Sequence, residues 1–272
     1  MTDKNSEVLH KAEVFIRDCQ FYDQPRLEAE IFPDGVSVLK DIPYIDDGSP
    51  EHLLDIYDTT GNRKTVECYI LIHGGAFVYG YKELDKNFGM RLAKTSGIPV
   101  VNVNYRLMPG VSLTGVIEDL ESAVDFVRRE YGFDTYHFTG DSAGGYLAML
   151  MAVRNDRAVS ASLICGCYTV DREDFPGAFF AGAGEEIPEE YYDLKLLAGR
   201  VEQMDVAIIT GDDDFLREDN RTLAALIPHA EFYDAVSAGG RVMTHVFPIG
   251  HPDWPEGQKS IEIIASFARK SC

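Results

Sequence analysis

The stretch Tyr136–Tyr146 reads Tyr-His-Phe-Thr-Gly-Asp-Ser-Ala-Gly-Gly-Tyr, and the rest of the chain can be interpreted around it. β-prone residues lead into a Gly-x-Ser-x-Gly motif, and an apolar helical run follows. In this context the motif places a serine on a sharp turn above a sheet. Side chains two residues before and after Ser142 would collide with the crossing strand and helix, which explains Gly140 and Gly144. The motif therefore predicts a nucleophilic serine at position 142.

Composition limits the partners that the chain can have. Of its 272 residues, 45 are acidic and 25 are basic, which gives a formal charge of −20. This charge disfavours binding to nucleic acid and to anionic membranes. Residues 1–14 are polar and lack the apolar core of a signal peptide, and no run of sequence is apolar for long enough to span a bilayer. We therefore expect a cytoplasmic protein with no nucleic-acid partner and no membrane insertion.

The cysteines do not form a recognisable framework. There are five of them, an odd number at irregular spacing, and a chain of this length does not need disulfides: Cys19, Cys68, Cys165, Cys167 and Cys272. Cys165 and Cys167 have no second pair and no nearby histidine, and no cluster of His, Cys, Asp and Glu shows the spacing of zinc ligands. The sequence predicts no metal and no other cofactor.

Strand-like and helix-like segments alternate along most of the chain. Strands are expected at residues 35–45, 52–57, 65–72, 100–105, 136–139, 159–168, 205–210 and 230–234, and helices at 7–23, 87–96, 114–131, 143–155, 219–227 and 256–269. This alternation predicts an α/β fold: a mostly parallel, doubly wound central sheet with helices on both faces. We expect one domain over residues 1–272, with an N-terminal helix at 7–23 and a small cap-like insertion at about 172–200. Residues 245–251 are expected to form a loop.

The chemistry of a serine nucleophile requires a general base, a carboxylate that orients the base, and N–H donors for the oxyanion. In chain order the candidates are the loop 73–76, Ser142, one of Asp212–Asp214, and His245 or His251. The loop 73–76, Ser142 and the Asp212–Asp214 loop each follow an expected strand, and sheets of this kind bind ligands beyond the carboxyl ends of their strands. From the residues alone, the choice among the aspartates and between the two histidines stays open.

These motifs resemble the hormone-sensitive-lipase-like branch of the α/β-hydrolases, the bacterial acetyl esterase/lipase type. The resemblance begins at about Leu53 and extends to the C-terminus. It is carried by the segments Leu54-Asp55-Ile56-Tyr57, His73-Gly74-Gly75-Ala76-Phe77, Asn104-Tyr105-Arg106-Leu107, Gly140-Asp141-Ser142-Ala143-Gly144-Gly145, Asp214-Phe215-Leu216-Arg217, His245-Val246-Phe247 and Pro255-Glu256. Two positions depart from that branch: Ala76 replaces the third glycine of its oxyanion loop, and Phe215 replaces the proline after its acid.

The resemblance implies a role for each part of the site. It implies a catalytic triad of Ser142, Asp214 and His245, with Asp213 and His251 as alternatives. The oxyanion donors would be the backbone N–H groups of Gly75, Ala76 and Ala143. The aspartate beside the nucleophile, Asp141, and the first loop residue, His73, would be structural. Of the other histidines, His137 is expected to be buried, and His10, His52 and His229 are expected at the surface.

The implied activity is hydrolysis of small carboxylic esters, with short acyl chains such as acetyl, through an acyl-enzyme intermediate. Five aromatic residues are candidates for the substrate pocket: Phe77, Tyr79, Phe179, Phe180 and Tyr191. One alternative is an amidase of the arylformamidase type, which resembles this branch through a His-Gly-Gly loop. Another is a non-catalytic small-molecule receptor, but such proteins typically lose a triad member. A homodimer is the assembly expected for such folds.

Overall fold

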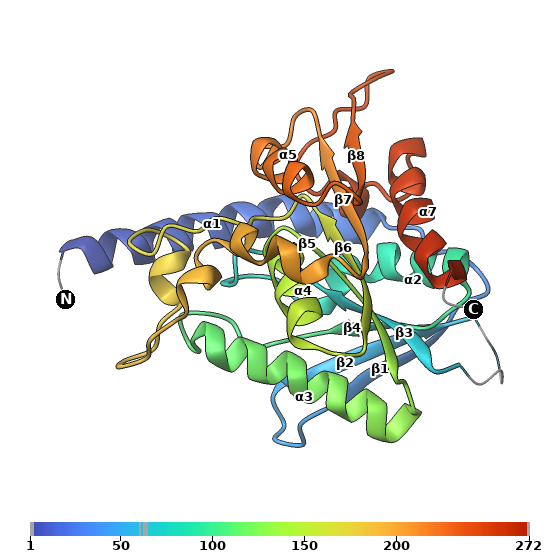
Figure 1. Cartoon of the computed structure of the whole chain (residues 1–272), viewed down its shortest axis with the longest axis horizontal. Helices are drawn as coiled ribbons and strands as arrows, with labels where there is room; N and C mark the ends of the chain where they lie inside the picture. Colours follow the sequence, from blue (N-terminus) through green and yellow to red (C-terminus); the bar gives the residue numbers. More distant parts are fainter. Residues whose placement is uncertain (1–2, 60, 62–64, 271–272) are drawn as a thin grey trace.

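The computed structural model describes residues 3–59, 61 and 65–270, which surround a central sheet (Figure 1). Within these residues the sheet has eight strands in the order β1-β2-β4-β3-β5-β6-β7-β8. They are β1 (Ser37–Pro43), β2 (Leu53–Asp58), β3 (Glu67–Ile72), β4 (Val100–Val103), β5 (Thr135–Asp141), β6 (Ala158–Ile164), β7 (Asp205–Gly211) and β8 (Glu231–Ala235). β2 pairs antiparallel with β1 and β4, and the other pairs are parallel. The predicted mostly parallel α/β sheet is confirmed.

Helices cover both faces of the sheet. The α-helices are α1 (Asp3–Ala29), α2 (Lys86–Ser96), α3 (Leu113–Tyr131), α4 (Ala143–Arg154), α5 (Arg217–Leu226), α6 (Phe247–Gly250) and α7 (Pro255–Lys270). The 3-10 helices are η1 (Pro50–His52), η2 (Lys82–Asp85), η3 (Gly177–Phe179), η4 (Glu189–Tyr191) and η5 (Leu194–Val201). α3 and α4 pack on one face, and α2 and α7 pack against each other on the opposite face (Figure 1).

The central strands are buried on both faces. Every residue of β3 is buried; Ile70 belongs to the apolar core under α3 and α4, and Leu71 to the core under α2 and α7. Successive side chains of a strand point to opposite faces, so a continuous apolar run is the sequence pattern of a strand covered on both sides. This explains why the short apolar runs in the sequence could be interpreted as parallel strands.

Helix α1 is longer than the expected helix at 7–23, because it continues through Pro25 to Ala29. Its C-terminal part is held by contacts with the body: Leu27 packs on the core, and Arg26 Nη1 donates to the carbonyl oxygen of Leu84 at 3.1 Å. Near its N-terminus, Lys11 Nζ lies 2.6 Å from Asp174 Oδ1. The helix therefore runs along the body and also contacts the segment that follows β6.

The segment at 172–200, expected as a small insertion, contains η3, η4 and most of η5. It contacts α1 again through Phe15 and Phe175, whose ring centroids are 5.7 Å apart. The expectation of a loop over 245–251 is wrong in part, because Phe247–Gly250 forms the short helix α6. Pro248 lies in its first turn, where proline's fixed φ and missing N–H fit a helix start.

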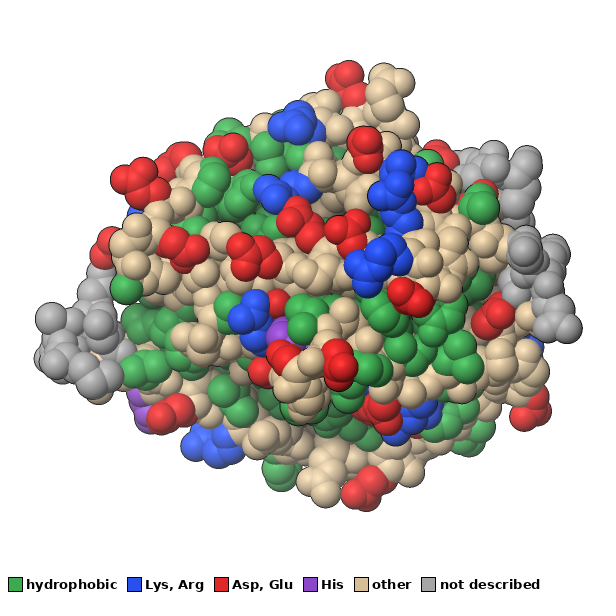
Figure 2. Space-filling view, turned by 90° about the horizontal axis from the view of Figure 1, so that it is seen from below, with side chains coloured by type: hydrophobic (Ala, Val, Ile, Leu, Met, Phe, Trp, Pro, Cys, Tyr) green, Lys and Arg blue, Asp and Glu red, His purple; other side chains and the backbone are tan. Residues whose placement is uncertain are grey.

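Charge is distributed widely over the surface. On the face shown in Figure 2, acidic side chains are scattered, and the basic side chains lie mostly beside them. Among the residues described, no helix is both long and apolar enough to cross a membrane. The cysteines at positions 19, 68, 165 and 167 are free thiols, and Cys272 lies outside the described residues.

Candidate active site

Ser142 lies on the turn between β5 and α4 in a strained conformation. Its backbone has φ 53° and ψ −118°, and its N–H donates to the carbonyl oxygen of Ile164 at 2.8 Å. A Cβ on Gly144 would lie 2.0 Å from the Ile72 oxygen, and a Cβ on Gly140 would lie 2.3 Å from the Gly144 oxygen. The close approach expected from the sequence is therefore present, and it fixes a backbone conformation that costs about 1–3 kcal/mol on its own.

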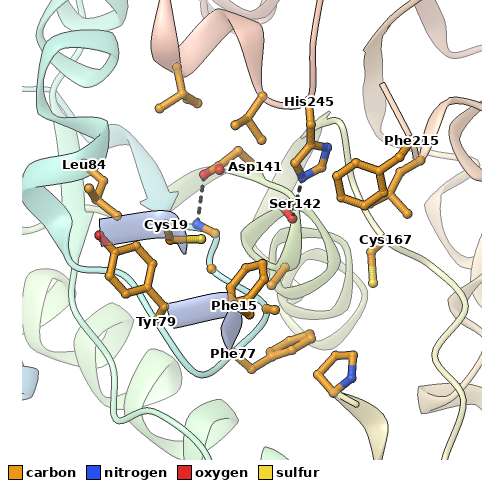
Figure 3. Close-up of a pocket in the computed structure, with 18 of the residues that line it drawn as sticks. Phe15, Cys19, Phe77, Tyr79, Leu84, Asp141, Ser142, Cys167, Phe215 and His245 are labelled. Carbon is orange, nitrogen blue, oxygen red and sulfur yellow. Dashed lines mark hydrogen bonds between the residues drawn. The ribbon is translucent and has the colours of Figure 1, made fainter. Parts of the chain in front are cut away.

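Ser142, His245 and Asp214 are joined in series, and Figure 3 shows the His245 imidazole directed at the Ser142 hydroxyl. His245 Nε2 lies 3.0 Å from Ser142 Oγ, and His245 Nδ1 lies 2.7 Å from Asp214 Oδ1. These contacts leave Nδ1 carrying a proton toward the carboxylate and Nε2 free to accept one from the serine. The geometry fits a hydroxyl activated by an oriented base.

Asp214 is held in place by donors other than the histidine. Thr210 Oγ1 donates to Asp214 Oδ2 at 2.7 Å, and the Leu216 N–H donates to Oδ1 at 3.0 Å. Burial tends to raise the pKa of Asp214, but the hydrogen bonds and the His245 charge outweigh it, so the pKa lies below its ordinary value. The carboxylate is therefore ionised at neutral pH, as an orienting group must be.

The alternatives that the sequence left open lie elsewhere. Asp213 is exposed. The carboxylate of Asp212 accepts the N–H of Ser237 at 2.9 Å, within a surface turn. His251 is stacked on Trp254, with ring centroids 3.8 Å apart. The structure thus brings Asp214 and His245 to Ser142.

The predicted oxyanion donors border the same cavity as Ser142. Gly75 has φ 108°, and a Cβ there would lie 2.0 Å from the Tyr79 oxygen, so only glycine fits. Ala76 follows with φ 49°, a left-handed conformation that costs an L-residue about 1–2 kcal/mol. Within the described part of the chain, the N–H groups of Gly75 and Ala76 have no protein acceptor. Ala143 is the first residue of α4, so its N–H has no acceptor within the helix.

His73 and Asp141 support this loop from behind. His73 is fully buried, stacks on Tyr105 with centroids 4.3 Å apart, and its Nδ1 lies 2.8 Å from the Gly74 oxygen. Burial lowers the pKa of His73 to about 4, so the ring is neutral. Asp141 Oδ1 accepts the Gly74 N–H at 3.0 Å. Both side chains therefore bond backbone, as the sequence analysis expected.

A cavity of about 640 Å³ opens in front of Ser142. Its wall is largely apolar, and Figure 3 shows aromatic side chains from several elements around the serine. The aromatic lining residues are Phe15, Tyr22, Phe77, Tyr79, Phe175 and Phe215; the charged ones are Asp18, Asp23, Arg26, Asp85, Asp141 and Asp171, beside His245. Helix α1 supplies one side of this wall, so the N-terminal segment is part of the site.

The pocket predictions were partly wrong. Phe77 and Tyr79 lie in the cavity wall, but Phe179, Phe180 and Tyr191 are absent from it as far as the described residues show. Phe180 is fully buried behind Phe77, with ring centroids 5.1 Å apart. Phe179 packs edge-on against Phe175, and the Tyr191 hydroxyl bonds Arg154 at 2.9 Å. These rings support the wall from outside instead of facing the substrate space.

The sequence predicted a helix at 7–23 but did not identify its residues Phe15, Cys19 and Tyr22 as part of the site. In the structure these residues of α1 line the cavity. Phe215 was noted only as a departure from proline. Its ring is 76% exposed, yet its centroid lies 4.2 Å from that of His245. It therefore forms the rim beside the general base.

One group of possible metal-ligand atoms lies within the site. Single atoms of Cys165, Asp214 and His245 fall within 4.8 Å of one another. The sequence gave no spacing signal for it, because the three residues come from different loops. Asp214 and His245 are already bonded to each other, and burial raises the pKa of the Cys165 thiol well above its ordinary value. A protonated thiol is a poor metal ligand, so we assign the cluster to the support of Asp214.

Comparison with known protein sequences finds partial similarity to esterases. Residues 54–172 match the family described as BD-FAE. The carboxylesterase/phospholipase LipF of Mycobacterium tuberculosis is 37% identical over 86 residues, which are 31% of this chain and 23% of LipF. Probable carboxylesterase 5 of Arabidopsis thaliana is 27% identical over 176 residues, 53% of each protein. The chain thus spans about a quarter of the first of these relatives and about half of the second.

Solved structures extend the likeness to the whole fold. Esterase B from Lactobacillus rhamnosis (HN001) superposes with a TM-score of 0.84 at 23% identity, covering 100% of this chain and 98% of that one. An esterase from the bacterial hormone-sensitive lipase family has a TM-score of 0.75 at 16% identity, covering 99% and 98%. The α/β-hydrolase fold is confirmed by these structures, whereas the sequence matches to esterases cover only part of the chain.

Proposed function

We propose that this α/β-hydrolase chain is a serine esterase that cleaves carboxylic esters through an acyl-enzyme. The observation that carries the proposal is the series of contacts from Ser142 Oγ to His245 Nε2 at 3.0 Å and from His245 Nδ1 to Asp214 Oδ1 at 2.7 Å. Acyl transfer requires a hydroxyl nucleophile, an oriented base and N–H donors for the oxyanion, and all three lie together here.

In the first half of the reaction, Ser142 Oγ attacks the ester carbonyl while His245 Nε2 takes the hydroxyl proton. The resulting imidazolium is stabilised by the Asp214 carboxylate. The oxyanion would accept the N–H groups of Gly75, Ala76 and Ala143, which are fixed before the substrate arrives. When the tetrahedral intermediate collapses, the alcohol leaves with the proton from His245, and the acyl group stays on Ser142.

In the second half, water replaces the alcohol. His245 takes one proton from the water, whose oxygen attacks the acyl carbonyl, and the same donors stabilise the second oxyanion. The carboxylic acid leaves as the proton returns to Ser142 Oγ. Each step reuses one base in alternating roles, so the two halves require the same geometry.

The finer proposal is a neutral ester with a short acyl chain. A cavity of about 640 Å³ holds such an ester together with its alcohol. Among the described residues that line the cavity, Asp18, Asp23 and Asp171 are acidic, and Arg26 is basic. The acidic side chains would repel an anionic substrate. The relatives named carboxylesterases and esterases support the ester class. The free thiols support a cytoplasmic location.

The test is a panel of p-nitrophenyl esters from acetyl to octanoyl, with an aryl formamide added. Wild type should favour the shorter esters and hydrolyse the formamide much more slowly. Ser142→Ala should lower kcat by about 10⁴-fold or more. Ser122→Ala, which changes a hydroxyl bonded to the Glu118 oxygen on α3, is the matched control and should not change kcat. Full activity of Ser142→Ala would refute the proposal, and a preference for the formamide would indicate an amidase.

A further inference from the structure

Two carboxyl groups that the proposed reaction does not use are buried beside the oxyanion loop, in the wall of the cavity. Asp141 ends β5 directly before the nucleophile, and Asp85 ends η2 directly before α2. They are 6% and 1% exposed, and their side chains are in hydrogen-bond contact with each other. Figure 3 shows Asp141 bonded to the backbone nitrogen of the loop. Two buried carboxyl groups in contact would repel each other if both were ionised, so something must stabilise this contact.

The contact requires a proton. Ionised carboxylates only accept hydrogen bonds, so two of them in contact repel unless one is protonated. Asp141 Oδ1 is occupied by the Gly74 N–H at 3.0 Å, whereas Asp85 Oδ2 is buried and no N–H or O–H group among the described residues donates to it. The proton therefore belongs on Asp85, which donates it to Asp141. Burial first, and the Asp141 charge second, raise the pKa of Asp85 well above its ordinary value.

The charged groups around the pair do not stabilise a second negative charge on it. Arg26 of α1 faces Asp85, but it is shared with Asp23 at 3.1 Å and Glu30 at 3.2 Å. Asp23 itself adds negative charge near the pair. On the other side, Tyr105 donates its hydroxyl to the His73 oxygen, and His245 faces Asp141 across Ser142. A second negative charge in the pair would have no counter-ion of its own.

The pair is also in direct contact with the loop that carries the oxyanion donors. A Cβ on Gly74 would lie 2.5 Å from Asp141 Oδ2 and 3.1 Å from the Cβ of Ser142. The Gly74 backbone thus packs against this carboxyl group with no room for another atom. Any movement of Asp141 must move Gly74, and with it the N–H groups of Gly75 and Ala76.

We propose that Asp85 and Asp141 form a proton-sharing carboxyl pair whose proton positions the oxyanion loop beside Ser142. Both are positioning residues, and their role in turnover rests on the proposed esterase function. With one proton in the pair, Asp141 holds Gly74 in place. When the proton is lost to water as the pH rises, two buried charges repel, and the loop moves. Because the oxyanion forms only during reaction, kcat falls while KM changes little.

Asp85→Asn tests this directly, since the amide donates to Asp141 at every pH and cannot lose a proton in this range. Wild-type kcat should fall by tenfold or more as the pH rises and the pair loses its proton, and this decrease should be absent in Asp85→Asn. Glu83→Gln is the control: Glu83 lies on the same 3-10 helix, but its carboxylate bonds Lys82. This variant should therefore retain the wild-type decrease in kcat. An unchanged alkaline decrease in Asp85→Asn would overturn the proposal.

Unfolding in urea tests the pair without any turnover. Because the pKa of Asp85 is raised in the folded state, wild type loses stability as pH rises from the unfolded value toward the folded one. Relative to Asp85→Asn, its folding equilibrium constant should fall by about tenfold per pH unit as the pH rises above the pKa of the unfolded carboxyl group, until the folded carboxyl group itself titrates. A stability difference independent of pH would refute the shared proton. If esters are not hydrolysed at all, the proposed function fails, but this measurement still decides on the pair.

Discussion

Replacing Gly144 by alanine tests the packing that holds the nucleophile in place. A Cβ at this position would lie 2.0 Å from the Ile72 oxygen and 2.7 Å from the His73 oxygen, whereas ordinary contacts of this kind begin at 3.4 Å. Both obstacles are backbone atoms of the strand end and the loop that precede the oxyanion donors. They cannot rotate away as a flexible side chain would, so the start of α4 must separate from the end of β3.

The size of the effect follows from this geometry. Inserting a methyl group into a packed core costs about 1–3 kcal/mol, and backbone on both sides favours the upper end, ~3 kcal/mol. Relief of the overlap requires a shift of roughly 1 Å at the turn carrying Ser142, and a misplacement of that size can lower the rate about 10²-fold. Gly144→Ala should therefore lose both stability and kcat.

The assays are urea unfolding for stability and steady-state hydrolysis of p-nitrophenyl acetate for rate. Gly199→Ala is the matched control, because a Cβ there meets nothing within 4 Å. It should leave both quantities unchanged. If Gly144→Ala retained wild-type stability and wild-type kcat, the steric account of the serine turn would be wrong.

Two further predictions concern charges. Asp214→Asn should lower kcat by about 10⁴-fold because it no longer orients the His245 proton, whereas Asp213→Asn, a change at the surface, should leave kcat unaltered; equal losses would reverse the assignment. The folded His73 ring has a pKa of about 4, so as the pH falls from 6.5 to 4 the ring binds a proton in the unfolded chain before it does so in the folded one. The free energy of unfolding, measured in urea, should therefore decrease by about 3 kcal/mol over this range. This decrease should be missing in His73→Asn.

Local sequence determined the parts of the site that depend on backbone geometry. The Gly-x-Ser-x-Gly turn follows from steric limits within a few residues, so Ser142 could be identified before any tertiary structure was known. The order of the loops then placed an aspartate and a histidine at the same edge of the sheet. The choice of Asp214 over Asp213 came from the motif resemblance, and in the structure it is Asp214 that reaches His245.

Long-range packing was not predictable in the same way. His52 was expected at the surface but is only 4% exposed, because Asp119 of α3 approaches its ring from a distant part of the chain while the nearby Asp47 lies on its other nitrogen. Phe179, Phe180 and Tyr191 of the insertion were expected in the pocket, yet Phe77 covers Phe180, and α1 supplies part of the wall instead. An amphipathic pattern says that a face is covered and does not say by what.

The same limit applies to the carboxyl pair. Asp141 was expected to be structural, and its carboxylate accepts the Gly74 N–H. No pattern in the sequence indicated that Asp85, the last residue of η2, would meet it, since 56 positions separate the two residues along the chain. Contacts of this separation are decided by the sheet order, which brings β3 beside β5 and places the loop after β3 against the serine turn.

The central claim is that Ser142 is a nucleophile activated by His245, and covalent labelling tests it most directly. Wild type treated with a fluorophosphonate should gain the mass of a single adduct, located by peptide mapping to Ser142. Ser142→Ala should remain unlabelled, and His245→Ala should react far more slowly. A folded wild-type protein that stays unlabelled, or that carries the adduct at another residue, would contradict the account.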